Sequence, residues 1–353
     1  MAQFSIAQLK ARSFGPFRDI DVKFSPGLNV LIGDNATGKS QLLKLAYSCT
    51  KALKDTPSLT KKDLSTAVAS KLKGTLRPDS LGRLTHRAQG RSRSEVMVKY
   101  SQIRKPLKFS FASQARREVA IDSVPDHELT DEPVYLPPHE LLTLSSNFIS
   151  LYDNYETGFD ETWRDTNELL LRPALRGARM RQAAKLLEPF ADLLQDGSVR
   201  ESNGRFYLHQ PGVGNLEAPL LAEGHRKLAM IVRLISNGML LEGGYLFWDE
   251  PEANLNPASQ NAVSNALVHL AAAGAQVFVA THSMFLLREL QMATENNSTT
   301  PRYIGLKRET HDAEDSSTAA VSAQTADDLD DIEPIAALEA EAGQANRYLS
   351  WAP

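Results

Sequence analysis

The chain has 353 residues, of which 42% are hydrophobic and 7% aromatic, and its formal net charge is −4. This length accommodates two average domains or one large α/β domain. The apolar stretches are too short to cross a bilayer, the N-terminus shows no secretory signal, and the single cysteine, Cys49, excludes an internal disulfide framework. We therefore expect a cytoplasmic protein with no membrane partner.

The first 53 residues contain segments in which apolar and polar residues alternate, as in strands, followed by a segment with helical spacing. Residues 4–9 and 20–24 predict two strands joined by a turn at Gly15-Pro16, and residues 28–32 form a continuous apolar run typical of a buried strand. A glycine-containing loop follows, and residues 40–53 show helical spacing. The predicted order is strand, loop, helix.

The next segment is strongly basic. Residues 51–117 contain 17 Lys and Arg against 4 Asp and Glu, and a strand pair is expected within residues 96–111. Such a segment suits nucleic acid, although a solvated basic surface is the simpler alternative. The structural role of this segment stays open at this point.

A mainly helical region and an alternating α/β region follow. A strand at 134–136 precedes helices up to about residue 194, and a helix is expected over 221–241. Strands are then expected at 245–248, 276–280 and 303–306, alternating with helices at 257–272 and 285–292. This alternation predicts a mainly parallel sheet.

The C-terminal part is acidic. Residues 309–341 contain 11 acidic residues and no Lys or Arg. Residues 310–327 are linker-like, and residues 332–349 predict a last amphipathic helix with Ile332, Ile335, Leu338 and Leu349 on one side. That helix suits docking to an effector protein. A second alternative is that the acidic segment folds back on the basic insertion of its own chain as an autoinhibitory mimic of nucleic acid, and a disordered tail is the simplest alternative.

The loop after the buried strand carries a complete G-x-x-x-x-G-K-S motif. Backbone amides of such a loop wrap the phosphates of ATP, Lys39 neutralises the β and γ phosphates, and Ser40 holds Mg²⁺. The helix that follows adds a favourable field for anions. The expected phosphate-binding residues are Gly33, Asp34, Asn35, Ala36, Thr37, Gly38, Lys39, Ser40 and Gln41.

Two further strand ends carry polar residues suited to hydrolysis. The apolar strand at 245–248 ends in Asp249, a candidate Mg²⁺ ligand, and Glu250, a candidate base that polarises the attacking water. His282 follows the strand at 276–280 and lies 33 residues after Asp249. A lone histidine is more often structural, but the expected position of its strand places His282 near the γ phosphate. Lys39, Glu250 and His282 are therefore the candidate catalytic residues.

A fourth element opens the helix that precedes Asp249. Gly224 near this helix start leaves backbone amides open to an anion, although the pattern is weak alone. The four elements, in this order, resemble the ABC-type ATPases of the RecF, SMC and OLD kind. The resemblance implies a P-loop NTPase, with an α/β fold that has a mainly parallel sheet, an N-terminal antiparallel β portion and a helical signature subdomain.

The resemblance also implies how two copies assemble. It implies a head-to-head homodimer, or a higher oligomer built from it, with ATP and Mg²⁺ at the interface. The signature segment of one copy closes on the γ phosphate of the other, and His282 acts as the switch histidine. The implied nucleotide-contacting residues beyond the P-loop are Ala222, Glu223, Gly224, His225 and, in the D-loop, Asn256.

The chain departs from the family pattern at three places. Ala222 and Glu223 stand where the signature usually has serine and glycine. The Q-loop candidate is residues 138–140, with Glu140 in place of glutamine. Only 182 residues separate Lys39 from Leu221, without sustained heptads, so a long coiled-coil arm is excluded.

The expected domain organisation follows from these elements. Residues 1–50 and 245–308 form the nucleotide-binding lobe, 51–130 a basic insertion, 131–244 the helical signature lobe, 309–331 an acidic linker and 332–353 a C-terminal helix.

The strongest resemblance, which includes residues 135–138, 249–256 and 281–290, is to small OLD-like, AAA-type ATPases of bacterial anti-phage defence systems. It implies a sensor or scaffold subunit that acts with a separate effector, a nuclease or toxin. The alternatives are a RecF-like DNA repair or recombination ATPase, with nucleic acid bound through residues 51–117, and a nucleotide-locked scaffold that turns over slowly. A transporter ATP-binding subunit fits least.

Overall fold

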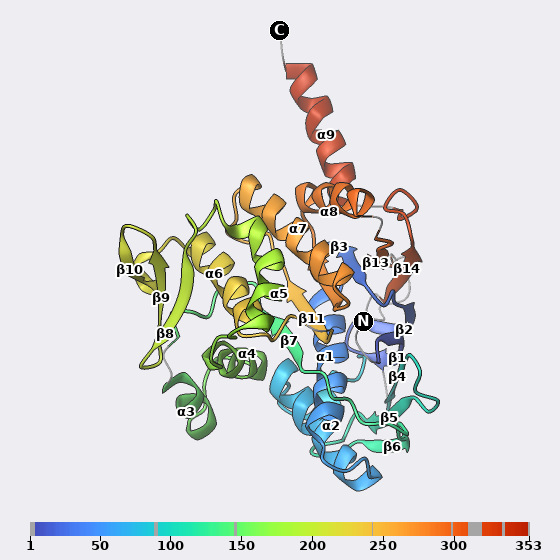
Figure 1. Cartoon of the computed structure of the whole chain (residues 1–353). Helices are drawn as coiled ribbons and strands as arrows, with labels where there is room; N and C mark the ends of the chain where they lie inside the picture. The colour runs from blue at the N-terminus through green and yellow to red at the C-terminus, as the bar shows by residue number, and fades with distance from the viewer. Residues whose placement is uncertain are drawn as a thin grey trace.

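The computed structural model describes residues 4–87, 91–144, 147–241, 243–297, 299–309, 320–333 and 336–351. Three sheets organise the chain (Figure 1). The sheet that positions the site has six strands in the order β14-β13-β3-β12-β11-β7, all parallel except β14. Its strands are β3 (Leu28–Gly33), β7 (Pro133–Leu136), β11 (Tyr245–Asp249), β12 (Gln276–Thr281), β13 (Arg302–Arg308) and β14 (Val321–Ala326).

Side chains of the parallel strands alternate between two cores. In β11, Leu246 and Trp248 face one core, and Tyr245 and Phe247 face the other. This period of two, with every β11 side chain buried, explains why the strand is a continuous apolar run. The mainly parallel sheet predicted from the sequence is confirmed.

The second sheet is antiparallel and has the order β2-β1-β4-β5-β6. Its strands are β1 (Ile6–Phe14), β2 (Phe17–Lys23), β4 (Arg93–Tyr100), β5 (Leu107–Ala112) and β6 (Ala120–Ser123). Because β1 pairs with β4, the predicted boundary at residue 50 does not coincide with a break in the sheet. Within residues 51–130, β4, β5 and β6 complete the N-terminal β portion, so these strands do not form a separate insertion.

Helices cover both faces of the parallel sheet. Helix α1 packs against β3, β7, β11 and β12 on the side of the antiparallel sheet, and α2 lies against α1. Helices α6, α7 and α8 contribute to the other core. The helices are α1 (Lys39–Asp55), α2 (Lys61–Leu76), α3 (Asn147–Asn154), α4 (Glu161–Leu171), α5 (Ala178–Leu187), α6 (Glu223–Ser236), α7 (Pro257–Ala272), α8 (Met284–Asn296) and α9 (Ala336–Trp351).

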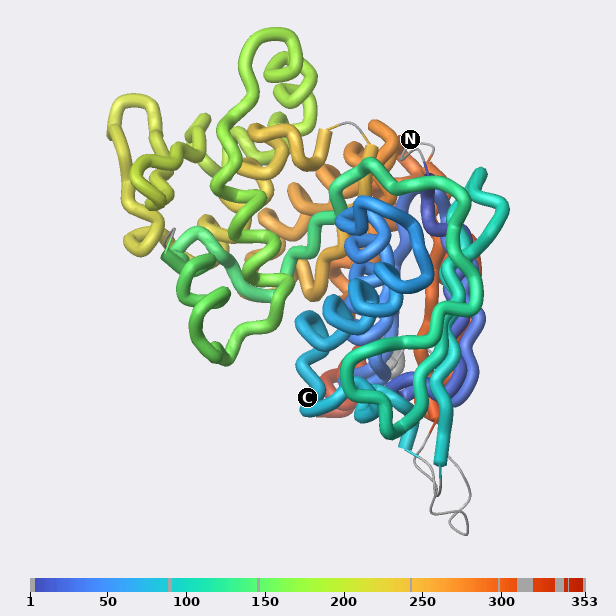
Figure 2. Tube along the Cα trace, turned by 90° about the horizontal axis from the view of Figure 1, so that it is seen from below, coloured from blue at the N-terminus to red at the C-terminus, as the bar shows by residue number. Residues whose placement is uncertain are grey.

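The middle of the chain forms a lobe at one side. Figure 2 shows residues 147–236, in green to yellow, on the side away from the antiparallel strands, in blue to teal. A three-stranded sheet of β8 (Ser198–Ser202), β9 (Arg205–Gln210) and β10 (Gly214–Glu217) extends this lobe. Short 3-10 turns lie at Leu81–Leu84, Glu188–Phe190 and Ala218–Leu220.

The C-terminal segment differs from the expectation of a linker. Val321–Ala326 forms β14, which pairs with β13 and extends the parallel sheet at its edge. Ile332 is buried and packs on Gly305, where a Cβ atom would lie 2.6 Å from its Cγ2. Ile332 thus anchors the chain before α9, and the side chains of Ile335 and Leu338 lie outside the described residues.

Helix α9 projects from the body beyond α8 (Figure 1). An ion pair of 2.8 Å between Arg288 and Glu341 joins the two helices. Tyr348, Leu349 and Trp351 are 67%, 70% and 80% exposed. Among the described helices, none has the length and apolar character needed to cross a membrane.

Candidate nucleotide-binding and hydrolysis site

Three neighbouring strands end at the same edge of the parallel sheet. The G-x-x-x-x-G-K-S loop follows β3, Asp249 closes β11, and His282 follows β12, which lies between them. Ligands of open α/β sheets bind at the carboxyl ends of the strands. The topology therefore gathers the three predicted polar elements at one edge.

The loop after β3 has the backbone shape of an anion cradle. Ala36 and Gly38 adopt φ values of 64° and 90°, in the left-handed region. A Cβ atom at Gly38 would lie 2.6 Å from Pro16 Cγ, and one at Gly33 would lie 2.5 Å from the Leu306 carbonyl oxygen. Glycine is therefore required at both positions. Asp34, Asn35 and Ala36 are exposed at the apex of the loop.

Lys39 occupies the inside of this loop. Its Nζ donates hydrogen bonds to the carbonyl oxygens of Gly33 at 2.6 Å and Asp34 at 3.0 Å. Burial lowers the pKa of Lys39, and the carboxylates of Glu250 and Asp249 oppose this shift. The ammonium thus lies inside the loop, from where the lysine of this motif reaches the β and γ phosphates. Thr37 braces the loop through a hydrogen bond of 2.8 Å from its hydroxyl to the Asp34 carbonyl.

Asp249, the carboxylate predicted to bind Mg²⁺, is buried at the end of β11. Burial raises the pKa of this carboxyl, Glu250 raises it further, and the hydroxyls of Ser40 and Tyr135 favour its charged form. Its Oδ2 accepts a hydrogen bond of 3.2 Å from Tyr135, whereas Oδ1 is buried with no hydrogen-bond partner among the described residues. A buried carboxylate oxygen without a partner, beside a serine hydroxyl, suits a hard divalent cation.

Glu250 begins the turn after β11 in a left-handed conformation. Its φ is 48°, and its amide donates to the Ala280 carbonyl at 2.9 Å. The side chain is 33% exposed, and Oε1 lies 3.5 Å from His282 Nδ1. The carboxylate is therefore open to water and held close to the histidine, as a general base requires.

Glu252 is a site residue that the sequence analysis missed. Its Oε1 accepts hydrogen bonds from Thr281 Oγ1 at 2.6 Å and from the His282 amide at 3.3 Å, and lies 3.7 Å from His282 Nδ1. The Glu252 side chain is 8% exposed, whereas that of His282 is 50% exposed. Glu252 thus ties the turn after β11 to the loop that carries His282. The sequence signal that could have identified Glu252 is its position two residues after Glu250, as a third carboxylate after Asp249 and Glu250.

The signature candidates lie at the start of α6. Ala222 is the N-cap residue without a side-chain cap, and Ala222 and His225 are exposed. A Cβ atom at Gly224 would lie 2.8 Å from the Asn254 carbonyl oxygen, so glycine permits close packing there. Asn254 Nδ2 donates to Glu223 Oε1 at 2.9 Å. The start of α6 is thereby fixed to the turn after β11.

Three other predicted residues have defined local roles. Asn256 Oδ1 caps α7 by accepting a hydrogen bond from the Ser259 amide at 2.8 Å. The Asn256 side chain therefore has a structural role within a single copy of the chain. Gln41 is exposed, and the end of its side chain lies against Gly15. Glu140, in the Q-loop candidate, is buried and lies 2.9 Å from Arg226 Nε on α6. The Q-loop candidate is thus attached to the signature helix.

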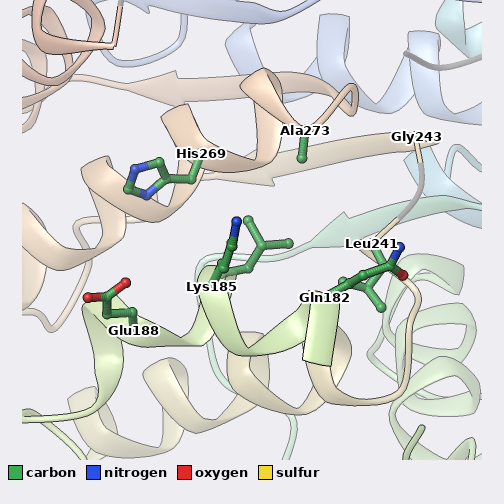
Figure 3. A pocket seen from close by; sticks show the side chains of 8 residues that line it. Gln182, Lys185, Glu188, Leu241, Gly243, His269 and Ala273 are labelled. Atoms are coloured by element: carbon green, nitrogen blue, oxygen red, sulfur yellow. The ribbon is translucent and has the colours of Figure 1, made fainter. Parts of the chain in front are cut away.

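A cavity of about 750 Å³ lies away from this edge, between α5 and α7. Figure 3 shows Lys185, Glu188 and His269 around it. Gly243 and Ala273, which also line it, precede the amino ends of β11 and β12. The cavity therefore lies at the opposite end of the strands from Lys39 and does not belong to the candidate site.

Comparisons with known proteins agree with this geometry. A family model described as "AAA domain, putative AbiEii toxin, Type IV TA system" matches residues 28–288. The DNA replication and repair protein RecF of Streptococcus uberis is 48% identical over 42 residues, which are 12% of this chain and 12% of RecF.

Two solved structures share the fold. An SMC head bound to the C-winged helix domain of ScpA has a TM-score of 0.53 at 12% identity, over 91% of this chain and 97% of that chain. An Smc head with an extended coiled coil, bound to the C-terminal domain of ScpA derived from Pyrococcus furiosus, has a TM-score of 0.54 at 12% identity, over 92% and 97%. These matches confirm the predicted fold class, a P-loop NTPase head.

Proposed function

The chain belongs to this AAA-domain family of P-loop ATPases, and on that premise we propose that it binds and hydrolyses ATP with Mg²⁺ between two copies of itself. The observation that carries the proposal is the convergence of Lys39, Asp249, Glu250 and His282 at one sheet edge. Each group has the chemistry that phosphoryl transfer to water needs: a cation, a metal ligand, a base and a histidine beside it.

The residues have separate tasks in the proposed reaction. Lys39 neutralises phosphate charge, and Ser40 and Asp249 would hold Mg²⁺, which supplies further charge neutralisation when bound. Glu250 orients and polarises the attacking water. His282, bracketed by Glu250 and Glu252 at 3.5 and 3.7 Å, is placed to sense the γ phosphate.

The position of α6 favours a site shared between copies. The start of α6 packs on the turn after β11, and β12 separates β11 from the strand that leads into the P-loop. Ala222 and His225 are exposed there. The backbone amides at this helix start are therefore available to the γ phosphate of a second copy.

Mixing two inactive variants tests the shared site. Lys39→Ala removes the phosphate cation. Ala222→Asp places a favourable N-cap on α6 but repels a phosphate from the partner. We expect each variant alone to be inactive, and an equal mixture to recover about a quarter of the wild-type ATPase rate, because half of random dimers contain one intact site. A mixture no faster than its separate components would contradict a site built from two copies.

We further propose that the chain acts as the sensor or scaffold of an anti-phage system with a separate effector. The family description, which names a putative toxin of a toxin–antitoxin system, supports membership of such a system. Helix α9, with its exposed Tyr348, Leu349 and Trp351, offers a surface for the effector. The alternative of a nucleotide-locked scaffold is the same assembly, in which ATP is hydrolysed more slowly than the assembly dissociates.

The RecF match favours DNA repair as a second candidate role. The structure reduces the basic charge available for nucleic acid, because Lys51 is paired with Glu132, and Lys71 is paired with Glu161 and Asp165. Arg87, Arg91 and Arg93 in the same segment are exposed.

One comparison separates these two roles. If nucleic acid is the ligand, Arg87, Arg91 and Arg93 replaced together by alanine should reduce the slope of log affinity against log salt by up to about 3. Replacing Arg176, Arg179 and Arg181 on and beside α5 removes equal charge and should leave the slope unchanged. The repair role is wrong under two conditions together. The wild type binds neither DNA nor RNA at low salt, and an effector protein co-purifies with the full chain but not with a chain truncated after residue 333. DNA binding without any such partner contradicts the effector role.

A further inference from the structure

Lys227, in the first turns of α6, is a buried cation that the reaction described above does not use. Lys227 is 1% exposed, and burial lowers the pKa of its ammonium group to about 8. A buried ammonium must have its hydrogen bonds satisfied. Lys227 Nζ meets this need with three carbonyl oxygens: Pro138 at 2.8 Å, Glu250 at 2.8 Å and Ala253 at 3.1 Å.

These three acceptors belong to two different loops at the catalytic edge. Pro138 follows β7 in the Q-loop candidate, whereas Glu250 and Ala253 lie in the turn after β11. An ammonium has three N–H donors, and each has one acceptor here. Lys227 therefore joins the signature helix to both loops through a single group.

The contact with Glu250 acts on a constrained backbone. Glu250 has a φ of 48°, a conformation that non-glycine residues rarely adopt. Its amide donates to the Ala280 carbonyl oxygen at 2.9 Å, and its own carbonyl oxygen accepts from Lys227 Nζ at 2.8 Å and from the Ala253 amide at 3.1 Å. The three hydrogen bonds fix the peptide groups on both sides of the Glu250 Cα, and the one from Lys227 is the bond that comes from α6. They therefore set the direction in which the carboxylate points, toward His282 at 3.5 Å.

The neighbouring cation Arg226 makes a different connection. Its Nε lies 2.9 Å from Glu140, and its Nη1 donates to the Leu221 carbonyl at 2.6 Å. Both contacts hold the Q-loop candidate and the start of α6, and neither reaches the turn after β11. Of these two adjacent cations, Lys227 is thus the one that bonds to the backbone of Glu250.

We propose that Lys227 is a positioning residue for hydrolysis: it fastens the turn that carries Glu250 to the signature helix, so that the Glu250 carboxylate is aligned with the attacking water. This inference rests on the proposed function, with Glu250 as the base. It adds a physical link between the start of α6, where a second copy would contact its phosphate, and the base of the same chain. A shift of α6 moves Glu250 through Lys227.

Arg233 provides a matched control on the same helix. It is also a buried cation, 3% exposed, and donates to the carbonyl oxygens of Leu170 at 2.9 Å and Arg172 at 2.8 Å. These partners lie at the end of α4, away from the catalytic edge. Arg233→Met removes two buried hydrogen bonds to carbonyl oxygens and Lys227→Met removes three, and only Lys227→Met affects the turn after β11.

The test measures kcat, KM, ATP affinity and thermal stability for Lys227→Met, Lys227→Gln and Arg233→Met. We expect both methionine variants to lose stability. Lys227→Met should lower kcat by about 100-fold with ATP affinity within about twofold, because misplacement of a catalytic group of about 1 Å costs that much. Lys227→Gln, which keeps two N–H donors, should recover part of the loss, and Arg233→Met should keep its kcat.

The outcomes separate this inference from the proposed function. A wild type that does not hydrolyse ATP, or that does so no faster than Lys39→Ala, refutes the proposed function. With an active wild type, an unchanged kcat in Lys227→Met overturns the inference, as does an equal loss of kcat in Arg233→Met. If Lys227→Met does not fold, Lys227→Gln decides: a lowered kcat at unchanged affinity supports positioning, and a wild-type kcat overturns it.

Discussion

Glu250→Gln is expected to bind ATP as tightly as the wild type and to hydrolyse it at least 100-fold more slowly, within the range typical of a lost general base. The amide keeps the shape of the side chain but does not accept the proton of the attacking water. The carboxylate is 33% exposed beside His282, so the substitution leaves no buried charge unpaired. Single-turnover release of phosphate, together with equilibrium binding of a fluorescent ATP analogue, measures the two properties separately.

The stability of the variant provides the control for Glu250→Gln. The backbone of Glu250 is held by Ala280 and Lys227, and glutamine retains both hydrogen bonds. The melting temperature should therefore stay within a few degrees of the wild type. Wild-type turnover by a folded Glu250→Gln protein would remove Glu250 from the role of base.

Lys39→Ala is expected to weaken ATP binding by about 100-fold or more, because charge-assisted hydrogen bonds to phosphate are among the strongest in proteins. The ammonium lies inside the loop after β3, bonded to the carbonyl oxygens of Gly33 and Asp34. Alanine leaves the loop without this cation. Equilibrium binding of the same ATP analogue measures the loss.

A conservative variant sharpens the Lys39 result. Lys39→Arg keeps the charge but replaces a compact ammonium with a planar guanidinium, for which the narrow loop has little room. We expect it to restore only part of the affinity. If Lys39→Ala binds ATP within about twofold of the wild type, the loop after β3 is not a phosphate cradle.

The strands that position the site were predictable because their signal is local. The apolar runs that became β3, β11 and β12 are buried on both faces, so nearly every residue is hydrophobic, and each run ends where a polar motif begins. The polar motifs therefore marked both the end of a strand and its chemistry. The order of the strands in the sheet, β14-β13-β3-β12-β11-β7, depends on pairing between distant segments and was not part of the prediction.

Other features depend on contacts between distant residues. Val321–Ala326 is weakly apolar and becomes a strand through pairing with β13, which local composition does not reveal. The number of basic residues in 51–117 does not reveal that Lys51 and Lys71 form ion pairs with acidic residues far along the chain. Glu252 and Lys227 acquire their roles from contacts with loops 23 to 89 residues away. Such roles are set by tertiary packing rather than by spacing.

The central claim is that ATP binds between two copies of the chain, and the mass of Glu250→Gln in solution tests it most directly. Sedimentation velocity at one protein concentration, with and without ATP and Mg²⁺, compares the two states of a variant that holds ATP without hydrolysing it. The account predicts that ATP doubles the sedimenting mass and that Lys39→Ala added to the same chain abolishes the change. A mass that stays constant while ATP is bound would contradict it.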